Sequence, residues 1–430
     1  MLDPTQLNNL SNEDISKIVN RNKLDLERYK ELVSTILNEV KEKQDNALIK
    51  YTNLYDKADI AEKDLLVTSE EIKKAYRNLT KRQLKVIKEL AKNIKEVHKK
   101  QIPSDKIIRR DEGVIVREIF NPLRSAGLYI PSGKAPYPST ALMLGIPAKV
   151  AGVPRLIACT PPARSGDVHP VILVALDIAG VDKIYRVGGA QAIGALAYGT
   201  EMIQKVDKIV GPGNIYVSTA KMLVSDSVGI DFFAGPSEIM IYADDTANPD
   251  YIAADMISQA EHDTLSVSIL ITPSEKLAVE VKNKILSKLL NKTRKQIIRE
   301  ALENNGHILI VSNETEAVNF INDFAPEHLE ILSYNPKKLL STIYNAGAIS
   351  IGEYTPVPVT DYALGANHVL PTSGSATFNS GLTVYDFLKI VHISQLNKRG
   401  LQKVKRITHE FASIEGLTAH ADSINERFEM

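Results

Sequence analysis

Residues 183–199 read K-I-Y-R-V-G-G-A-Q-A-I-G-A-L-A-Y-G and pass from a β-rich run into a helical one through two adjacent glycines. The same transition recurs on both sides of this stretch. β-rich runs and helical segments alternate at 127–130, 139–150, 156–160, 168–180, 183–187, 189–199, 208–210 and 214–225. Alternation at this spacing is typical of a parallel sheet with crossover helices. We therefore expect an α/β domain in this part of the chain.

A second alternation follows, with β-rich runs at 238–243, 266–272 and 307–311 separated by helical segments. Two α/β halves are the simplest interpretation. The first hundred residues are helical in pattern, with capping-box spacings at Thr68/Glu71 and Thr80/Gln83. After about residue 381 the pattern becomes helical again, and we expect a helical tail to the end of the chain.

Composition excludes several classes of protein. The 52 Lys and Arg balance the 52 Asp and Glu, which removes the electrostatic argument for a nucleic-acid partner. The apolar stretches are too short to span a membrane, and the N-terminus has no signal-peptide pattern. These features predict a soluble, cytoplasmic protein. The single cysteine, Cys159, cannot build a thiolate zinc cluster, so any metal here must use nitrogen and oxygen ligands.

Two glycine-rich turns, at 188–189 and 211–213, follow consecutive predicted strands and fall on the same edge of the predicted sheet. Ligands of open α/β sheets bind at the carboxyl ends of the strands, and small residues let a phosphate or ribose approach the backbone there. Neither turn has the full dinucleotide-binding fingerprint. The alternative is that both are tight turns in which glycine is needed for a positive φ.

Four of the nine histidines lie near other polar residues, in the stretches 259–262, 327–328, 361–368 and 415–420. Gln259 and His262 are three residues apart at the end of a predicted helix and share a face. An imidazole and an oxygen donor in that arrangement can begin a site for zinc or another divalent ion, which Asp361 and another histidine would complete. Taken one at a time, each of these residues is also explained as a hydrogen-bonded structural residue.

Glu327 and His328 are neighbours in the sequence. Neighbours on a strand point to opposite faces, so both side chains reach one cleft only where the chain is irregular. Together they would supply two proton acceptors of different pKa, which suits a reaction that removes protons more than once. The alternative is a loop glutamate beside a histidine that starts a helix.

Several longer stretches resemble the signature motifs of histidinol dehydrogenases. They are 185–194 (Y-R-V-G-G-A-Q-A-I-G), 208–216 (K-I-V-G-P-G-N-I-Y), 234–238 (A-G-P-S-E), 257–262 (I-S-Q-A-E-H), 325–330 (A-P-E-H-L-E) and 415–420 (E-G-L-T-A-H). The resemblance runs from about residue 25 to the C-terminus in the family's order. It implies oxidation of L-histidinol through the aldehyde to L-histidine, the last step of histidine biosynthesis, with two NAD.

The resemblance also implies a set of site residues, with one zinc per subunit. The implied zinc ligands are Gln259, His262, Asp361 and His420. The implied proton acceptors are Glu327 and His328, the further substrate contacts Ser237, His368 and Glu415, and the NAD contacts Tyr129, Gln191 and Asn214. We expect His328 to accept the alcohol proton and Glu327 to activate the water that adds to the aldehyde. Cys159 ends a predicted buried strand and matches no catalytic motif, so we do not expect a thiohemiacetal.

The family's fold gives the expected domains. They are an N-terminal helical segment (1–25), a Rossmann-like catalytic and zinc domain (26–124 with 237–381), a Rossmann-like NAD domain (125–236) and a C-terminal helical tail (382–430). Both Rossmann-like domains would be incomplete. In the family's homodimer the tail reaches the partner, so Glu415 and His420 would complete the other subunit's site.

Two rival functions remain on the residues alone. A zinc hydrolase would use the same nitrogen and oxygen metal site with Glu327 as base, and would need neither the glycine-rich turns nor NAD. A non-enzymatic binding protein with two α/β lobes would need neither paired bases nor a metal.

Overall fold

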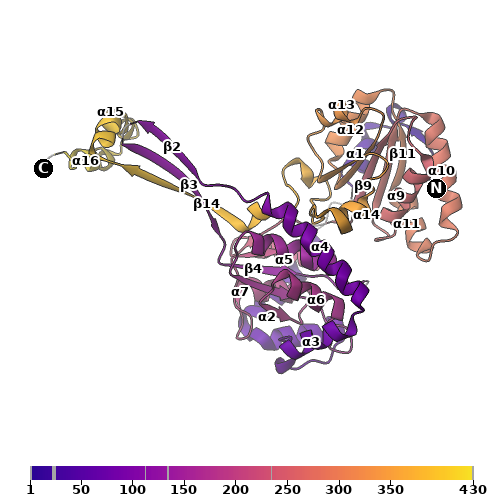
Figure 1. The fold of residues 1–430 in the computed structure, drawn as a ribbon, viewed down its shortest axis with the longest axis horizontal. Helices are drawn as coiled ribbons and strands as arrows, with labels where there is room; N and C mark the ends of the chain where they lie inside the picture. Colours follow the sequence, from indigo (N-terminus) through magenta and orange to yellow (C-terminus); the bar gives the residue numbers. More distant parts are fainter. Residues whose placement is uncertain (1, 22–25, 112, 133–134, 234, 429–430) are drawn as a thin grey trace. The chain divides into compact units, whose positions relative to one another are not determined.

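The structure is a computed structural model that describes residues 2–21, 26–111, 113–132, 135–233 and 235–428. The chain forms two compact units. The first comprises Met1–Gln101 and Leu123–Phe387, and the second comprises Ile102–Pro122 and Leu388–Met430. Two α/β lobes make up the first unit (Figure 1).

The first lobe is built on a five-stranded parallel sheet in the order β6-β5-β4-β7-β8. Its strands are β4 (Ser125–Tyr129), β5 (Arg155–Cys159), β6 (Lys183–Tyr185), β7 (Lys208–Val210) and β8 (Gly229–Ile230). The crossover helices are α5 (Pro138–Val150), α6 (Pro170–Ala179), α7 (Gly189–Tyr198) and α8 (Ile215–Val224). Counted along the chain, the spatial order is 3-2-1-4-5, the start of the doubly wound order. The predicted alternation of strands and helices is confirmed.

The long N-terminal helices cover both faces of this first sheet. They are α2 (Leu26–Tyr51), α3 (Ser69–Asn78) and α4 (Lys81–Lys99). Both predicted capping boxes are present at the starts of α3 and α4. On one face, Ile87 and Ile94 of α4 share a core with Leu128 of β4. On the other, α2 packs against α7 and α8.

The expected assignment of 26–124 to the catalytic domain is therefore wrong. Residues 26–101 belong to the first lobe together with residues 125–236, because their apolar faces are buried against its sheet. An apolar stripe predicts that a helix packs, but it carries no information about which sheet it packs on.

The second lobe has a six-stranded parallel sheet in the order β1-β11-β10-β9-β12-β13. Its strands are β1 (Thr5–Gln6), β9 (Glu238–Ala243), β10 (Val267–Thr272), β11 (Gly306–Ile310), β12 (His328–Leu332) and β13 (Ala348–Ile351). Helices α9 (Pro249–Ala260), α10 (Glu275–Leu289) and α11 (Lys295–Asn305) contribute to one core, and α12 (Glu314–Phe324) and α13 (Pro336–Leu340) to the other. From β9 to β13 the order is again 3-2-1-4-5.

The N-terminal segment expected as a separate helical piece belongs partly to this second lobe. Strand β1 pairs in parallel with β11 at the sheet edge, and α1 (Asn12–Val19) follows it. Leu7 and Ile18 are buried in the same core as Phe324. Residues 22–25 of the segment lie outside the described residues.

The second unit is a three-stranded antiparallel sheet with two helices. Strands β2 (Lys106–Asp111), β3 (Val114–Pro122) and β14 (Leu388–Leu396) run in the order β14-β3-β2, followed by α15 (Lys398–Ile414) and α16 (Thr418–Asn425). The expected all-helical tail at 382–430 is thus wrong in its first part, because residues up to Phe387 belong to the first unit and Leu388–Leu396 form a strand. The nine paired residues of β14 and β3 also explain why 102–122 groups with the tail. Exchange of the tail in a dimer stays a prediction.

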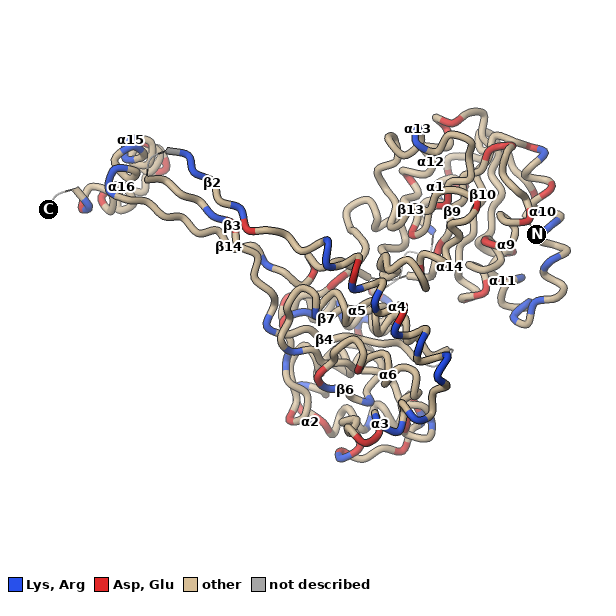
Figure 2. The backbone as a smooth tube through the Cα atoms, in the orientation of Figure 1, with Lys and Arg blue, Asp and Glu red and all other residues tan. Residues whose placement is uncertain are grey.

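Charges of both signs occur on both α/β lobes (Figure 2). This distribution agrees with the balanced composition and offers no one-sign lobe for a polyanion. Among the described residues, none of the helices is both long and apolar enough to cross a membrane.

Candidate active site and cofactor pocket

Glu327 and His328 lie together at the amino end of β12. Helix α12 ends at Phe324; the next residue, Ala325, has a left-handed φ of +49°, and Pro326 follows. Glu327 therefore precedes the regular strand, whose first residue is His328. The Glu327 Oε1 and His328 Nε2 atoms are 4.0 Å apart, and both side chains are buried. The chain is irregular where the sequence argument required it, and the histidine starts a strand rather than a helix.

The Glu327 carboxyl accepts a hydrogen bond from the first residue of the adjacent strand, β9. The Glu238 backbone N–H donates to Glu327 Oε2 at 2.8 Å. The Glu238 side chain, itself fully buried, accepts hydrogen bonds from Arg21 Nε and Nη2 at 3.0 and 2.6 Å. Burial, followed by repulsion from Glu238 and Asp361, raises the pKa of Glu327 well above its ordinary value, while the Glu238 N–H and Arg21 oppose this shift.

Arg21 was missed by the sequence argument. It is buried between the lobe's sheet and α12, where its guanidinium also donates to the Phe324 carbonyl and lies 3.2 Å from the centre of the Phe324 ring. Arg21 and Glu238 are far apart in the sequence, and no motif links them. A single sequence offers no signal for this pair.

Two further histidines of the first unit, His262 and His368, interact electrostatically with His328. Burial, then the positive charges that His368 and His262 would carry, lower the pKa of His328 to about 3. Burial and His262 likewise lower the pKa of His368 to about 4. All three imidazoles are therefore neutral at pH 7, and each has a nitrogen lone pair that can accept a proton or bind a metal.

Asp361 belongs to the same cluster. It lies in the turn Thr360–Leu364, and its backbone carbonyl is 3.3 Å from His368 Nδ1. Burial raises the pKa of Asp361 to about 7, with no compensating cation among the described residues. A half-buried carboxyl beside neutral imidazoles is a donor set that suits a divalent cation.

The other predicted metal and substrate residues are divided between the two units of the chain. Gln259 is buried in the last turn of α9, and the His262 N–H donates to its carbonyl, so both lie at one helix end. Ser237 directly precedes β9. Glu415 and His420 belong to the second unit, at the end of α15 and in α16. Within the described chain, the predicted donors do not form a group of three by themselves; such a group occurs at Asp45, Glu62 and Glu201.

The three predicted NAD contacts line one pocket of about 280 Å³ at the carboxyl edge of the first sheet. Tyr129 ends β4, Gln191 lies in the first turn of α7, and Asn214 caps α8. Both polar atoms of the Gln191 amide are buried without a hydrogen-bond partner. A buried, unpartnered amide in a concave site indicates a polar ligand.

Both glycine-rich turns also need glycine, as the alternative held. Gly189 has φ +63° and Gly211 has φ +124°, and a Cβ at Gly211 would lie 2.2 Å from the Tyr129 carbonyl oxygen. The glycines therefore permit the backbone conformation of these turns, and the turns also border the pocket. Cys159 is fully buried at the end of β5, and burial raises the pKa of its thiol, which makes it a poor nucleophile.

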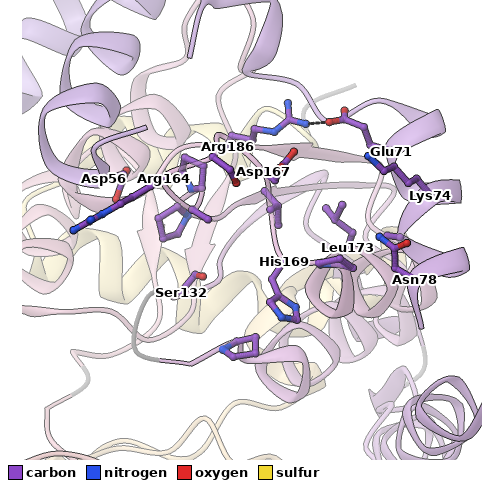
Figure 3. A pocket seen from close by; sticks show the side chains of 18 of the residues that line it. Asp56, Glu71, Lys74, Asn78, Ser132, Arg164, Asp167, His169, Leu173 and Arg186 are labelled. Carbon is purple, nitrogen blue, oxygen red and sulfur yellow. Dashed lines mark hydrogen bonds and ion pairs between the residues drawn. The ribbon is translucent and has the colours of Figure 1, made fainter. Parts of the chain in front are cut away.

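A larger pocket of about 840 Å³ adjoins the first and was not predicted (Figure 3). The two share Tyr55, Asp56, Ser132 and Pro161. Figure 3 shows the ion pair between Arg186 and Glu71, with Asp56 and Arg164 on one side of this view and Lys74 on the other. Side chains of both signs line this pocket.

Two parallel-sheet lobes, with a buried acid–base pair in one and a ligand pocket in the other, define an α/β enzyme. The sequence profile of the histidinol dehydrogenase family matches residues 19–428. The chain belongs to the histidinol dehydrogenase family, and is an oxidoreductase of histidine biosynthesis.

The similarity to individual relatives extends over nearly the full length of both chains. Histidinol dehydrogenase from Methanocaldococcus jannaschii is 47% identical, covering 98% of each chain. That from Clostridium acetobutylicum is 47% identical over 97% of this chain and all of the relative. The crystal structure of histidinol dehydrogenase from Elizabethkingia anophelis is 37% identical, with a TM-score of 0.94 over 98% of this chain and 97% of that one.

Proposed function

We propose that the protein catalyses the zinc-dependent, four-electron oxidation of L-histidinol to L-histidine through L-histidinaldehyde, with two NAD. The observation that carries this proposal is the buried pair of Glu327 and His328, 4.0 Å apart. The two successive oxidations each release protons, and two adjacent acceptors of different acidity suit that requirement.

The two side chains divide the proton transfers. His328 is proton-free at pH 7 because its pKa is lowered, so it accepts the proton of the alcohol hydroxyl as the first hydride leaves. Glu327 activates the water that adds to the aldehyde before the second hydride leaves. Its raised pKa favours the protonated form in the unliganded site, and positive charge entering the site favours ionisation. The backbone N–H of Glu238 orients the carboxyl for this role.

Zinc, one ion per subunit, would be held by Gln259, His262 and Asp361 of one subunit and His420 of the partner. Neutral His262 and an Asp361 carboxyl without a cation fit such an ion. When bound, zinc would supply Lewis acidity and orient the imidazole and amine of histidinol. Ser237, His368 and Glu415 would contribute further substrate contacts.

NAD would bind the first lobe through Tyr129, Gln191 and Asn214. The unpartnered Gln191 amide supports this proposal, as does the position of the pocket at the carboxyl edge of a sheet in doubly wound order. We regard both lobes as incomplete Rossmann-like domains. The protein would act as a homodimer in which the tail carrying Glu415 and His420 completes the partner's site.

The chemistry is tested by following NADH formation from NAD with histidinol and, separately, with the aldehyde. We expect His328→Asn to slow both oxidations and Glu327→Gln to slow chiefly the aldehyde step. Equal losses with both substrates in Glu327→Gln would refute the division of labour. No NADH from zinc-loaded protein would refute the dehydrogenase itself and favour a zinc hydrolase, which needs no NAD.

The composite site is tested by subunit complementation. His262→Asn and His420→Asn should each be inactive and zinc-poor. If zinc lies between subunits, the co-expressed variants form heterodimers with one intact site, so activity returns. If both ligands come from the same subunit, each site in the heterodimer lacks one of them and the mixture stays inactive.

A further inference from the structure

The smaller pocket contains an unpaired carboxyl group. Asp56 is the last residue of the π-helical turn Thr52–Asp56 that follows α2, and Lys57 ends this turn with a left-handed φ of +55°. The Asn53 side chain accepts from the Ile60 N–H at 3.1 Å and donates to the Ile60 carbonyl at 3.4 Å. These two hydrogen bonds fix residues 57–60, which follow Asp56, against Asn53, so local structure holds the segment that carries the carboxyl.

Asp56 stands out among the described residues of the pocket. The others are aromatic, aliphatic, small or neutral polar, and Asp56 is the one charged side chain. Its Oδ2 atom is buried and has no hydrogen-bond partner. Leaving a buried acceptor unsatisfied destabilises the protein, so an unsatisfied acceptor in a pocket indicates a ligand that supplies donors.

The chemistry of that ligand follows from the carboxylate. Burial raises the pKa of Asp56 to about 6, so at pH 7 and above the group is mostly ionised. An ionised carboxylate only accepts hydrogen bonds, and two hydroxyl donors on adjacent carbons match its two oxygens. A ribose diol has this arrangement.

We propose that Asp56 accepts hydrogen bonds from the 2′- and 3′-hydroxyls of the adenosine ribose of NAD and thereby selects NAD over NADP. This inference rests on the proposed use of NAD. The pocket's described lining includes neither Glu327 nor His328, so it holds the half of the cofactor that does not carry the reacting ring. Tyr55 and Tyr216, both partly exposed in the pocket, offer aromatic faces for the adenine.

The selection has a simple electrostatic basis. NADP carries a phosphate on the 2′-oxygen, which removes one donor and brings negative charge against the Asp56 carboxylate. The adjoining pocket has cations that would otherwise accept that phosphate, including Arg164 and Lys74, whereas Arg186 is paired with Glu71. Asp56 is thus the group that opposes NADP at the junction of the two pockets.

The test is Asp56→Asn, assayed with NAD and with NADP at saturating histidinol. We expect the KM for NAD to rise by about tenfold to a hundredfold, which is the value of a charge-assisted hydrogen bond, with kcat nearly unchanged. We expect kcat/KM with NADP to rise, because the repulsion is gone and Arg164 remains. An NAD-to-NADP preference equal to that of the wild type would overturn the proposal.

Two further variants separate specificity from structure. Asp59→Asn changes an exposed aspartate three residues along the chain, which lies outside both described pocket linings, and should leave the preference unchanged. Asp56→Glu keeps the charge and should still reject NADP; loss of the preference in this variant would contradict the electrostatic basis.

Direct binding of NAD and NADP by calorimetry, without histidinol, keeps the two proposals apart. A wild type that binds NAD but produces no NADH would refute the proposed function and leave the Asp56 inference standing. A wild type that binds both cofactors equally would overturn the inference even if the enzyme is active.

Discussion

Replacement of Arg21 by methionine tests how the second lobe holds its buried acid. Arg21 and Glu238 are 6% and 0% exposed at their side chains, and two hydrogen bonds of 3.0 and 2.6 Å join them. Removing one partner of a buried ion pair costs about 3–5 kcal/mol, because the other charge is left unpaired. The lost contact with the Phe324 ring adds about 1 kcal/mol. We therefore expect a loss near the upper end of that range.

Urea denaturation followed by circular dichroism measures this loss, since the chain has no tryptophan for fluorescence. The matched control is Lys17→Met, which removes an exposed cation from α1 and should cost well under about 1 kcal/mol. A double variant, Arg21→Met with Glu238→Gln, should cost much less than the sum of the single changes. A single-variant loss below about 1 kcal/mol, or additive losses, would refute the reasoning.

The same variant has a second readout at the active site. The Arg21 charge lowers the pKa of Glu327, so its removal should raise that pKa further. The pH profile of aldehyde oxidation should then shift to higher pH, because ionisation of Glu327 needs a more basic solution. An unshifted profile in a folded variant would show that Arg21 acts only on stability.

Three other changes have definite expected outcomes. Gly211→Ala should weaken NAD binding and lower the melting temperature more than Gly352→Ala does. A Cβ at Gly211 meets a backbone oxygen, whereas Gly352, also at positive φ, has open space around it; equal effects of the two changes would contradict this reasoning. Gln191→Leu should weaken NAD binding in calorimetry yet leave the melting temperature unchanged or higher, since the amide has no partner in the free protein. Burial and the Asp255 carboxyl raise the pKa of Glu330 from 4.5 to about 8, so its contribution to stability is present below pH 4.5 and is lost as the pH rises through 8. Glu330→Gln should therefore flatten the decline of stability between pH 5 and 8 in urea titrations, and an unchanged slope would refute the assignment.

Local signals in the sequence were sufficient for strands β4 to β7 and the crossover helices α5 to α8. The change of period in 183–199, with glycines at the junction, corresponds to β6 and α7. The two capping boxes mark the starts of α3 and α4 because a helix start must satisfy its own amide groups nearby. The convergence of Glu327 and His328 also follows from local geometry, since the irregular chain before β12 lets neighbours share one side.

Long-range relationships could not be predicted in the same way. Strand β14 is mostly exposed, so burial imposes no alternation on its residues, and its partner β3 lies far away in the sequence. The packing of α2 to α4 on the first lobe depends on which apolar face is available, which no helix encodes alone. The pairing of Arg21 with Glu238 joins positions 217 residues apart. It depends on the folded chain burying both side chains at one place, which the sequence around either residue does not encode.

The parallel pairing of Thr5 with Leu309 has a consequence for biogenesis. On the ribosome, β1 must remain unpaired until β11 has been synthesised, because the two strands are far apart in the sequence. If β1 has not paired with β11 when the chain leaves the ribosome, β11 keeps an open strand edge, and such an edge can pair with other chains. Pairing of β1 with β11 thus completes one edge of the second lobe's sheet.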